Sequence, residues 1–239
     1  MVHVMATSFP GFPKELFSFL TELSQNNNRE WFADNKERYK QVVVEPMSDF
    51  VVAMIPRLKS VSECFVADPR SHGGSMFRIY RDTRFSKDKS PYKNNIGCHF
   101  RHMAGKNAHA PGFYLHIEAN ELFFGGGIWK PPGNILESIR SAIVNKPDQW
   151  ETIVNNKSLV KRFGEIKGDK LKRPPRGYAG DLEHIEDIKR KSYFLIQSAD
   201  PELILSPKFI TEVQRNFKSI SPFMEFITTA VHLPYHYPA

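Results

Sequence analysis

Apolar residues recur every three or four positions through the first quarter of the chain, which predicts helices between residues 12 and 60. The first helix has a stripe formed by Leu16, Phe19, Leu20 and Leu23. Asn28 precedes the second helix and is typical of an N-cap. Pro46 suits the first turn of a third helix, and Pro56 predicts a kink or an end within it.

Between residues 63 and 128 the pattern changes to short stretches in which apolar and polar residues alternate, bounded by Gly, Pro and Asn. Alternation with this spacing is typical of β-strands. We therefore predict a central, mainly antiparallel sheet, with strands in CFVA, MFRIYR, NIGCHFRHM, GFYLHIEA and ELFF.

Residues 131–231 have a mostly helical pattern with one late strand, YFLIQ at 193–197. We expect Asp181 to cap a helix through Lys189, and Phe209 to begin a long terminal helix. Because the late strand must pair with an earlier one, residues 1–239 are predicted to form a single α+β domain. Its order is N-terminal helices, central sheet and C-terminal helices.

The composition agrees with a soluble globular protein: 41% of the 239 residues are hydrophobic and 25% are charged. No apolar run approaches the ~20 residues that would span a bilayer, so a membrane protein is not expected. The first residues do not form a basic segment followed by an apolar stretch, and Cys64 and Cys98 form no CxxC pair. We expect a cytoplasmic protein.

The formal net charge of +7 and the pI of about 9.3 favour anionic partners. Much of this charge is concentrated in residues 76–93, MFRIYRDTRFSKDKSPYK. If MFRIYR is a strand, Phe77 and Ile79 face the core and Arg78 and Tyr80 face away. The next residues then form an irregular corner, Arg81-Asp82-Thr83-Arg84, in which the carboxylate can hold one guanidinium.

Neighbouring strands carry polar side chains on the same predicted face, including His99, Arg101 and Tyr114. The glycine triplet 125–127 is expected to expose backbone N–H groups, and Trp129 to form a wall. Arginine grips phosphate and carboxylate in a fork geometry, so this surface predicts a site for an anionic small molecule. The candidate ligand-binding residues are Arg78, Arg81, Asp82, Arg84, Lys89, Tyr92, Arg101, His116, Gly126 and Trp129.

Three other interpretations stay open. The same pocket would be enzymatic if His116 or Glu118 acted as the general acid or base on a phosphorylated or other anionic substrate. The basic loop at 161–180 would bind nucleic acid without sequence preference. The arginine motif would be purely structural if its charges pair within the protein. No spacing matches a metal-ligand or cofactor motif, so neither is predicted, and the oligomeric state is left open.

The motif Arg78-x-x-Arg81-Asp82-x-Arg84-Phe85, followed by KSPYK, resembles the signature of a family of bacterial and fungal proteins catalogued as domain of unknown function 2461. The resemblance extends to residues 26–39, 112–132 and 171–178. It implies a single α+β domain with the arginine segment as the family hallmark. It brings no established activity and no catalytic residues.

Overall fold

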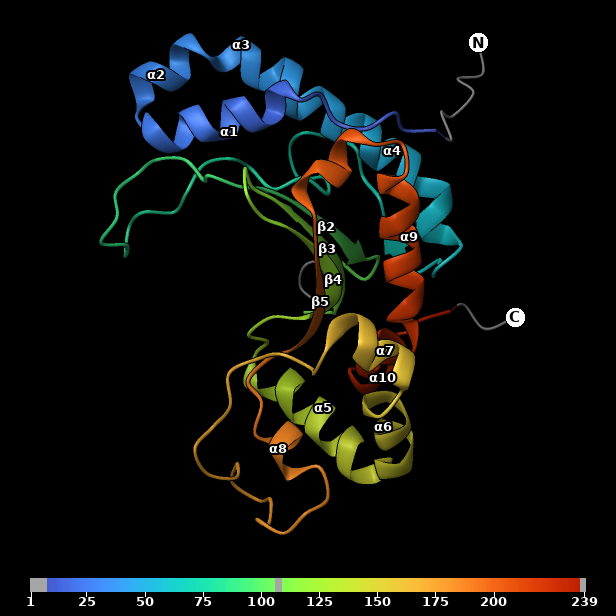
Figure 1. Cartoon of the computed structure of the whole chain (residues 1–239). Helices are drawn as coiled ribbons and strands as arrows, with labels where there is room; N and C mark the ends of the chain where they lie inside the picture. Colours follow the sequence, from blue (N-terminus) through green and yellow to red (C-terminus); the bar gives the residue numbers. More distant parts are fainter. Residues whose placement is uncertain (1–7, 106–108, 237–239) are drawn as a thin grey trace.

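The computed structural model describes residues 8–105 and 109–236. These form an α+β structure in which helices come before and after the first four strands along the chain (Figure 1). The N-terminal helices fall within the predicted region. They are α1 (Glu15–Gln25), α2 (Arg29–Asp34), α3 (Lys36–Tyr39), a π-helical turn (Lys40–Val44) and α4 (Glu45–Lys59).

Two sequence signals in these helices have different outcomes. The predicted N-cap is confirmed, because the Asn28 side chain accepts a hydrogen bond from the backbone N–H of Trp31 at 2.9 Å. Pro56 does not end α4 where it stands, since the helix continues to Lys59. A proline in the last turn removes only one hydrogen bond, so the helix ends soon after it rather than at it.

The described residues form a five-stranded antiparallel sheet in which each strand pairs with the next. The strands are β1 (Phe65–Val66), β2 (Ile96–His102), β3 (Gly112–Ile117), β4 (Leu122–Ile128) and β5 (Tyr193–Ala199). The late strand thus lies at the edge, beside β4.

The predicted strand MFRIYR does not form as such. Its segment makes only isolated bridges, Met76 to Cys98 and Tyr80 to Tyr92. Met76 and Ile79 are both buried, which breaks the alternation of a regular strand. Phe77 therefore does not reach the core as predicted, whereas Arg78 and Tyr80 are exposed as expected.

The C-terminal part contains α5 (Gly133–Asn145), α6 (Pro147–Val154), α7 (Lys157–Phe163), α8 (Ile185–Ile188), a 3-10 turn (Pro201–Leu205), α9 (Phe209–Ser219) and α10 (Ser221–Ala230). Two predictions here are wrong. Asp181 caps no helix, because α8 begins only after His184, whose φ of 57° is left-handed. The long terminal helix breaks at Ile220, where Pro222 favours a new first turn.

One face of the sheet is the core. Alternate residues of β2 and β3, including Cys98, Phe100, Phe113 and Leu115, are fully buried, as the sequence predicted. Aromatic rings of α9 pack on them, with Phe113 and Phe217 4.6 Å apart between ring centroids. In Figure 1, α4 and α9 lie on this side of the sheet.

The other face, which we call the open face, carries His99, Tyr114, Phe123 and Ile196. In Figure 1 it is flanked by residues 77–93 on one side and by the loop 164–184 on the other. We call residues 77–93 the arginine arm. Within the part of the chain that is described, no helix is both long enough and apolar enough to cross a membrane.

Candidate ligand-binding groove

The floor of the open face consists of aromatic rings lying over glycines. A Cβ on Gly112 would lie 2.1 Å from His99 Nε2, and one on Gly97 would lie 2.8 Å from the Tyr114 hydroxyl. These two rings therefore occupy the space that side chains would otherwise fill. Phe77 packs on both, with ring centroids 5.9 Å from His99 and 6.0 Å from Tyr114.

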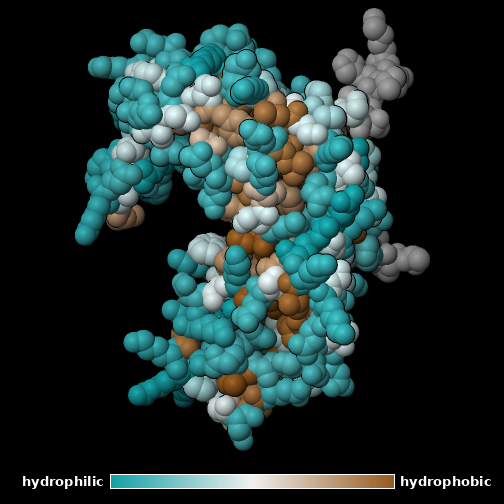
Figure 2. Space-filling model, in the orientation of Figure 1, coloured by the Kyte–Doolittle hydropathy of each residue, from teal (hydrophilic) through white to brown (hydrophobic). Residues whose placement is uncertain are grey.

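A groove of about 560 Å³ runs over this floor. Its walls are mainly apolar and include Phe123, Trp129, Phe194 and Ile196. Trp129 is 65% exposed and packs on Phe194 at 5.1 Å between ring centroids. Figure 2 shows the molecule hollowed on this side, with hydrophobic residues at the back of the hollow. A groove of this size and lining suits a small molecule with a flat apolar body.

The lining of the groove carries positive charge, whereas the carboxylates of Glu118 and Glu121 lie beside it, next to His116. No Asp or Glu lines it among the described residues, while Lys130 lies at its rim over the Trp129 ring, 5.4 Å from the centroid. Arg101 pairs in register with Gly112 of the floor. Burial, aided by the nearby charge of Arg101, lowers the pKa of His99 to about 4, so this imidazole is neutral at pH 7.

Two arginines of the arginine arm form ion pairs with carboxylates of the same arm. The Arg84 guanidinium donates to both oxygens of Asp82, at 2.9 and 2.7 Å, which is the bidentate pairing that the sequence suggested. Arg81 forms an ion pair with Asp88 across the arm. Both pairs lie within the arm itself, and neither arginine lines the groove.

Other arm residues also have structural contacts. Lys89 Nζ donates to the Thr83 carbonyl at 2.9 Å. Tyr92 is buried and stacks on Phe32, with ring centroids 4.1 Å apart. The Asn27 side chain exchanges two 3.0 Å hydrogen bonds with the Tyr92 backbone, which fastens the arm to the N-terminal helices. Tyr92 is thus a packing residue in this structure rather than part of the groove.

The glycine triplet has a packing role that differs from the predicted one. Residues 125–127 lie in β4 and pair with both neighbouring strands, so their N–H groups lie in the plane of the sheet rather than facing a ligand. A Cβ on Gly126 would lie 2.7 Å from Met224 Sδ and 2.9 Å from Ile220 Cδ1. Glycine at this position allows α10 to approach the sheet.

His116 and Glu118 come together beside the groove. The His116 ring stacks on Phe123 at 4.3 Å, and its Nε2 lies 3.0 Å from Glu118 Oε1. Its Nδ1 lies 3.2 Å from the Tyr114 hydroxyl and 3.3 Å from Asn95 Nδ2. The imidazole is therefore contacted at both nitrogens.

The structure divides the predicted site residues into two groups. Gly126 and Trp129 line the groove, and Arg101 and His116 adjoin it through Gly112 and Phe123. The others belong to the arginine arm: Arg78, Arg81, Asp82, Arg84, Lys89 and Tyr92. Sequence reasoning did not assign His99 to the final ligand set and missed Lys130, Phe194 and Ile196. The alternation of YFLIQ places the last two on one face, but does not say which strand lies beside them.

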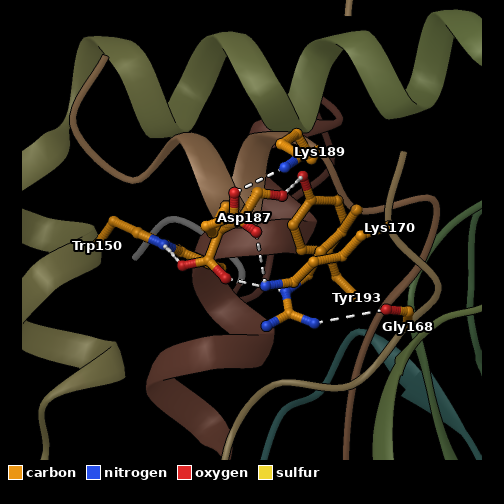
Figure 3. A network of polar contacts seen from close by, with 8 residues as sticks. Trp150, Gly168, Lys170, Asp187, Lys189 and Tyr193 are labelled. Atoms are coloured by element: carbon orange, nitrogen blue, oxygen red, sulfur yellow. Dashed lines mark hydrogen bonds and ion pairs between the residues drawn. The ribbon is translucent and has the colours of Figure 1, made fainter. Parts of the chain in front are cut away.

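A polar network that was not predicted connects α6 and α8 to β5 (Figure 3). The Asp187 carboxylate accepts from Trp150 Nε1 and from Arg190 Nε, both at 2.9 Å. Its backbone carbonyl accepts from the Tyr193 hydroxyl at 2.8 Å, and Arg190 also donates to the Gly168 carbonyl at 3.5 Å. The network ties α6, α8 and β5 to the loop 164–184 and serves the fold rather than a ligand.

These features define an α+β protein with a helix-covered sheet face and a second face that carries a groove. The sequence profile of the family described as conserved hypothetical protein (DUF2461) matches residues 15–226. The chain belongs to this family, as its arginine motif suggested. A search of curated proteins finds no match.

Proposed function

We propose that the protein binds a small molecule with a flat apolar body and one anionic group, such as a carboxylate or phosphate, in the groove on the open face. The observation that carries this proposal is the groove itself, which has a volume of about 560 Å³. The described residues that line it are mainly aromatic and aliphatic, and none of them is Asp or Glu. The proposal keeps the anionic ligand and the sheet surface that the sequence suggested, but it leaves out the residues of the arginine arm, which do not line the groove.

The aromatic rings of the groove favour a ligand with an apolar body. The floor formed by His99 and Tyr114 and the wall formed by Trp129 and Phe194 present flat surfaces to the same space. Aromatic faces pack well on other planar groups, and the neutral His99 ring adds a polar atom without adding charge. A planar apolar body fits this space better than an extended polar chain.

An anionic group on the ligand requires a positive charge near the groove that is not already paired. The ion pairs of Arg81 and Arg84 are satisfied within the arm. Among the described residues, the Lys130 side chain makes a cation–π contact at the rim and no ion pair. Its backbone N–H donates to Ser192 Oγ at 2.9 Å, which holds the Lys130 backbone in place. We therefore assign the contact with the anionic group to Lys130.

Anilinonaphthalene sulfonate and its uncharged analogue phenylnaphthylamine test the two parts separately by fluorescence titration. We expect Lys130→Gln to weaken sulfonate binding about three- to fivefold, since an exposed ion pair contributes up to ~1 kcal/mol. The uncharged probe should bind this variant as it binds the wild type. Trp129→Ala should weaken both probes, because it removes the wall of the groove.

Lys161→Gln removes one exposed positive charge from α7 and is the matched control. It should leave both titrations unchanged. If Lys130→Gln and Lys161→Gln reduce sulfonate binding equally, the effect is one of net charge and the assigned contact is wrong. If Trp129→Ala changes neither titration, the groove is not the binding site.

A further inference from the structure

We propose that His116, Glu118 and Glu121 form a binding site for one divalent transition-metal ion such as Mn²⁺ or Zn²⁺. The three residues each offer one ligand atom, and these atoms all lie within 4.8 Å of one another. This site is separate from the contact assigned to Lys130, and its argument does not depend on ligand binding in the groove.

The spacing of the ligand atoms fits a metal ion. His116 Nε2 lies 3.0 Å from Glu118 Oε1 and 3.9 Å from Glu121 Oε2. Ligand atoms about 2.1 Å from a metal in tetrahedral geometry are roughly 3.4 Å apart, which lies between these two distances. Small side-chain rotations of the two glutamates are sufficient to admit the ion.

The β3–β4 turn explains why the three residues meet. Ile117 and Leu122 are the last pair in register, and the N–H of Glu118 donates to the Glu121 carbonyl at 2.7 Å, which closes the turn. Glu118 follows the last residue of β3 and is two positions from His116, so the two side chains are expected on the same face. The closed turn brings Glu121 back to that same face.

The histidine is oriented from its other nitrogen. Its Nδ1 lies 3.2 Å from the Tyr114 hydroxyl and 3.3 Å from the Asn95 amide, and its ring stacks on Phe123 with 9° between the planes. Histidines that bind metals are held in this way by a second group at the nitrogen that does not coordinate. The side chain of His116 is only 13% exposed, so few other orientations are open to its ring.

Metal binding also determines where the ring proton of His116 lies. Coordination requires an unprotonated Nε2, so the ring proton must lie on Nδ1 when the metal is bound. The Tyr114 hydroxyl can then accept from Nδ1–H, since a hydroxyl both donates and accepts, whereas Asn95 Nδ2 only donates, so the Asn95 amide must turn its oxygen toward the ring. Any proton that Nε2 carried in the hydrogen bond with Glu118 is released to solvent.

The donor set selects the class of metal. One imidazole nitrogen with two carboxylate oxygens suits Mn²⁺, Fe²⁺ and Zn²⁺ better than Ca²⁺ or Cu⁺, which prefer all-oxygen and sulfur donors respectively. Three protein ligands leave at least one coordination position for water or another oxygen donor. Phe123 and Tyr114 contact His116 and also line the groove, so the ion would lie next to it.

Titration of the full chain with Mn²⁺, followed by the loss of the free-ion EPR signal, tests the site directly. We expect one saturable ion per chain in the wild type, and at least tenfold weaker binding in His116→Gln and in Glu121→Gln. Glu63→Gln is the matched control, because Glu63 pairs with another histidine, His236, at 3.5 Å. It should bind Mn²⁺ as the wild type does.

A second measurement on the wild type does not depend on the variants folding. Bound Mn²⁺ should broaden the ring resonances of His116 at substoichiometric metal, before those of His72 and His236. Absence of saturable binding would overturn the proposal. So would Mn²⁺ binding that is equally strong in His116→Gln, Glu121→Gln and the control, or broadening that begins at another histidine.

Discussion

Replacement of Asp187 with asparagine is expected to lower the free energy of unfolding by about 3–5 kcal/mol, which is the usual cost of breaking a buried ion pair. The side chains of Arg190 and Asp187 are only 7% and 17% exposed. The carboxylate accepts one hydrogen bond on each oxygen, from Trp150 and from Arg190. An amide has only one acceptor oxygen, so one buried donor loses its partner and Arg190 loses its counter-charge. Urea unfolding followed by fluorescence measures the change.

Asp82→Asn is the comparison for this prediction. Asp82 also holds an arginine through two hydrogen bonds, but both partners are largely exposed on the arginine arm. Because solvent screens such a pair, the urea midpoint should stay close to that of the wild type. If both variants lost the same free energy of unfolding, burial would not explain how much the Asp187 network contributes to stability.

The free energy of unfolding is expected to fall as the pH drops from about 6.5 to about 4, and His99 should account for about 3 kcal/mol of this fall. The pKa of His99 is about 4 in the folded protein, mainly because the ring is buried, and 6.5 is its ordinary value. Between these two values the unfolded chain binds the proton and the folded protein does not. Acid therefore stabilises the unfolded state, by ~1.4 kcal/mol for each unit of difference.

Urea unfolding at several pH values tests this in the wild type, His99→Gln and His99→Phe. Neither variant titrates at this position, so both should lose the same part of the pH dependence even if their stabilities differ at pH 7. Arg101→Gln should raise the pKa of His99 part of the way toward 6.5, because the Arg101 charge is the second cause of the shift. A wild-type pH profile retained in both His99 variants would contradict the assignment.

The local features of the fold could be predicted from the sequence. Alternation assigned the buried residues of β2 and β3 to the correct face, and Asn28 marked the start of α2. A guanidinium held by Asp82 could be expected from the closeness of Arg81 and Arg84 in the chain, but the spacing does not say that the partner is Arg84. Each of these depends on neighbours in the chain, and the spacing of residues contains that information.

The groove could not be predicted in the same way. Its wall requires Phe194 and Ile196 of β5 to lie beside Gly127 and Gly125 of β4, and no local pattern gives that register. Because positive charge is concentrated in the arginine arm, six of the ten residues expected to bind the ligand lie there. There the carboxylates of Asp82 and Asp88, within the same short segment, satisfy two of the guanidiniums.

The order of the strands has a consequence for folding kinetics. β2, β3 and β4 are joined by short connections and can pair early. β5 is separated from β4 in the sequence by α5–α8, although the two strands are neighbours in the sheet. Closing such a long loop costs entropy before its contacts form, and it slows folding. We expect docking of β5 to be a late step, and until it docks the edge of β4 is open to pairing with another chain.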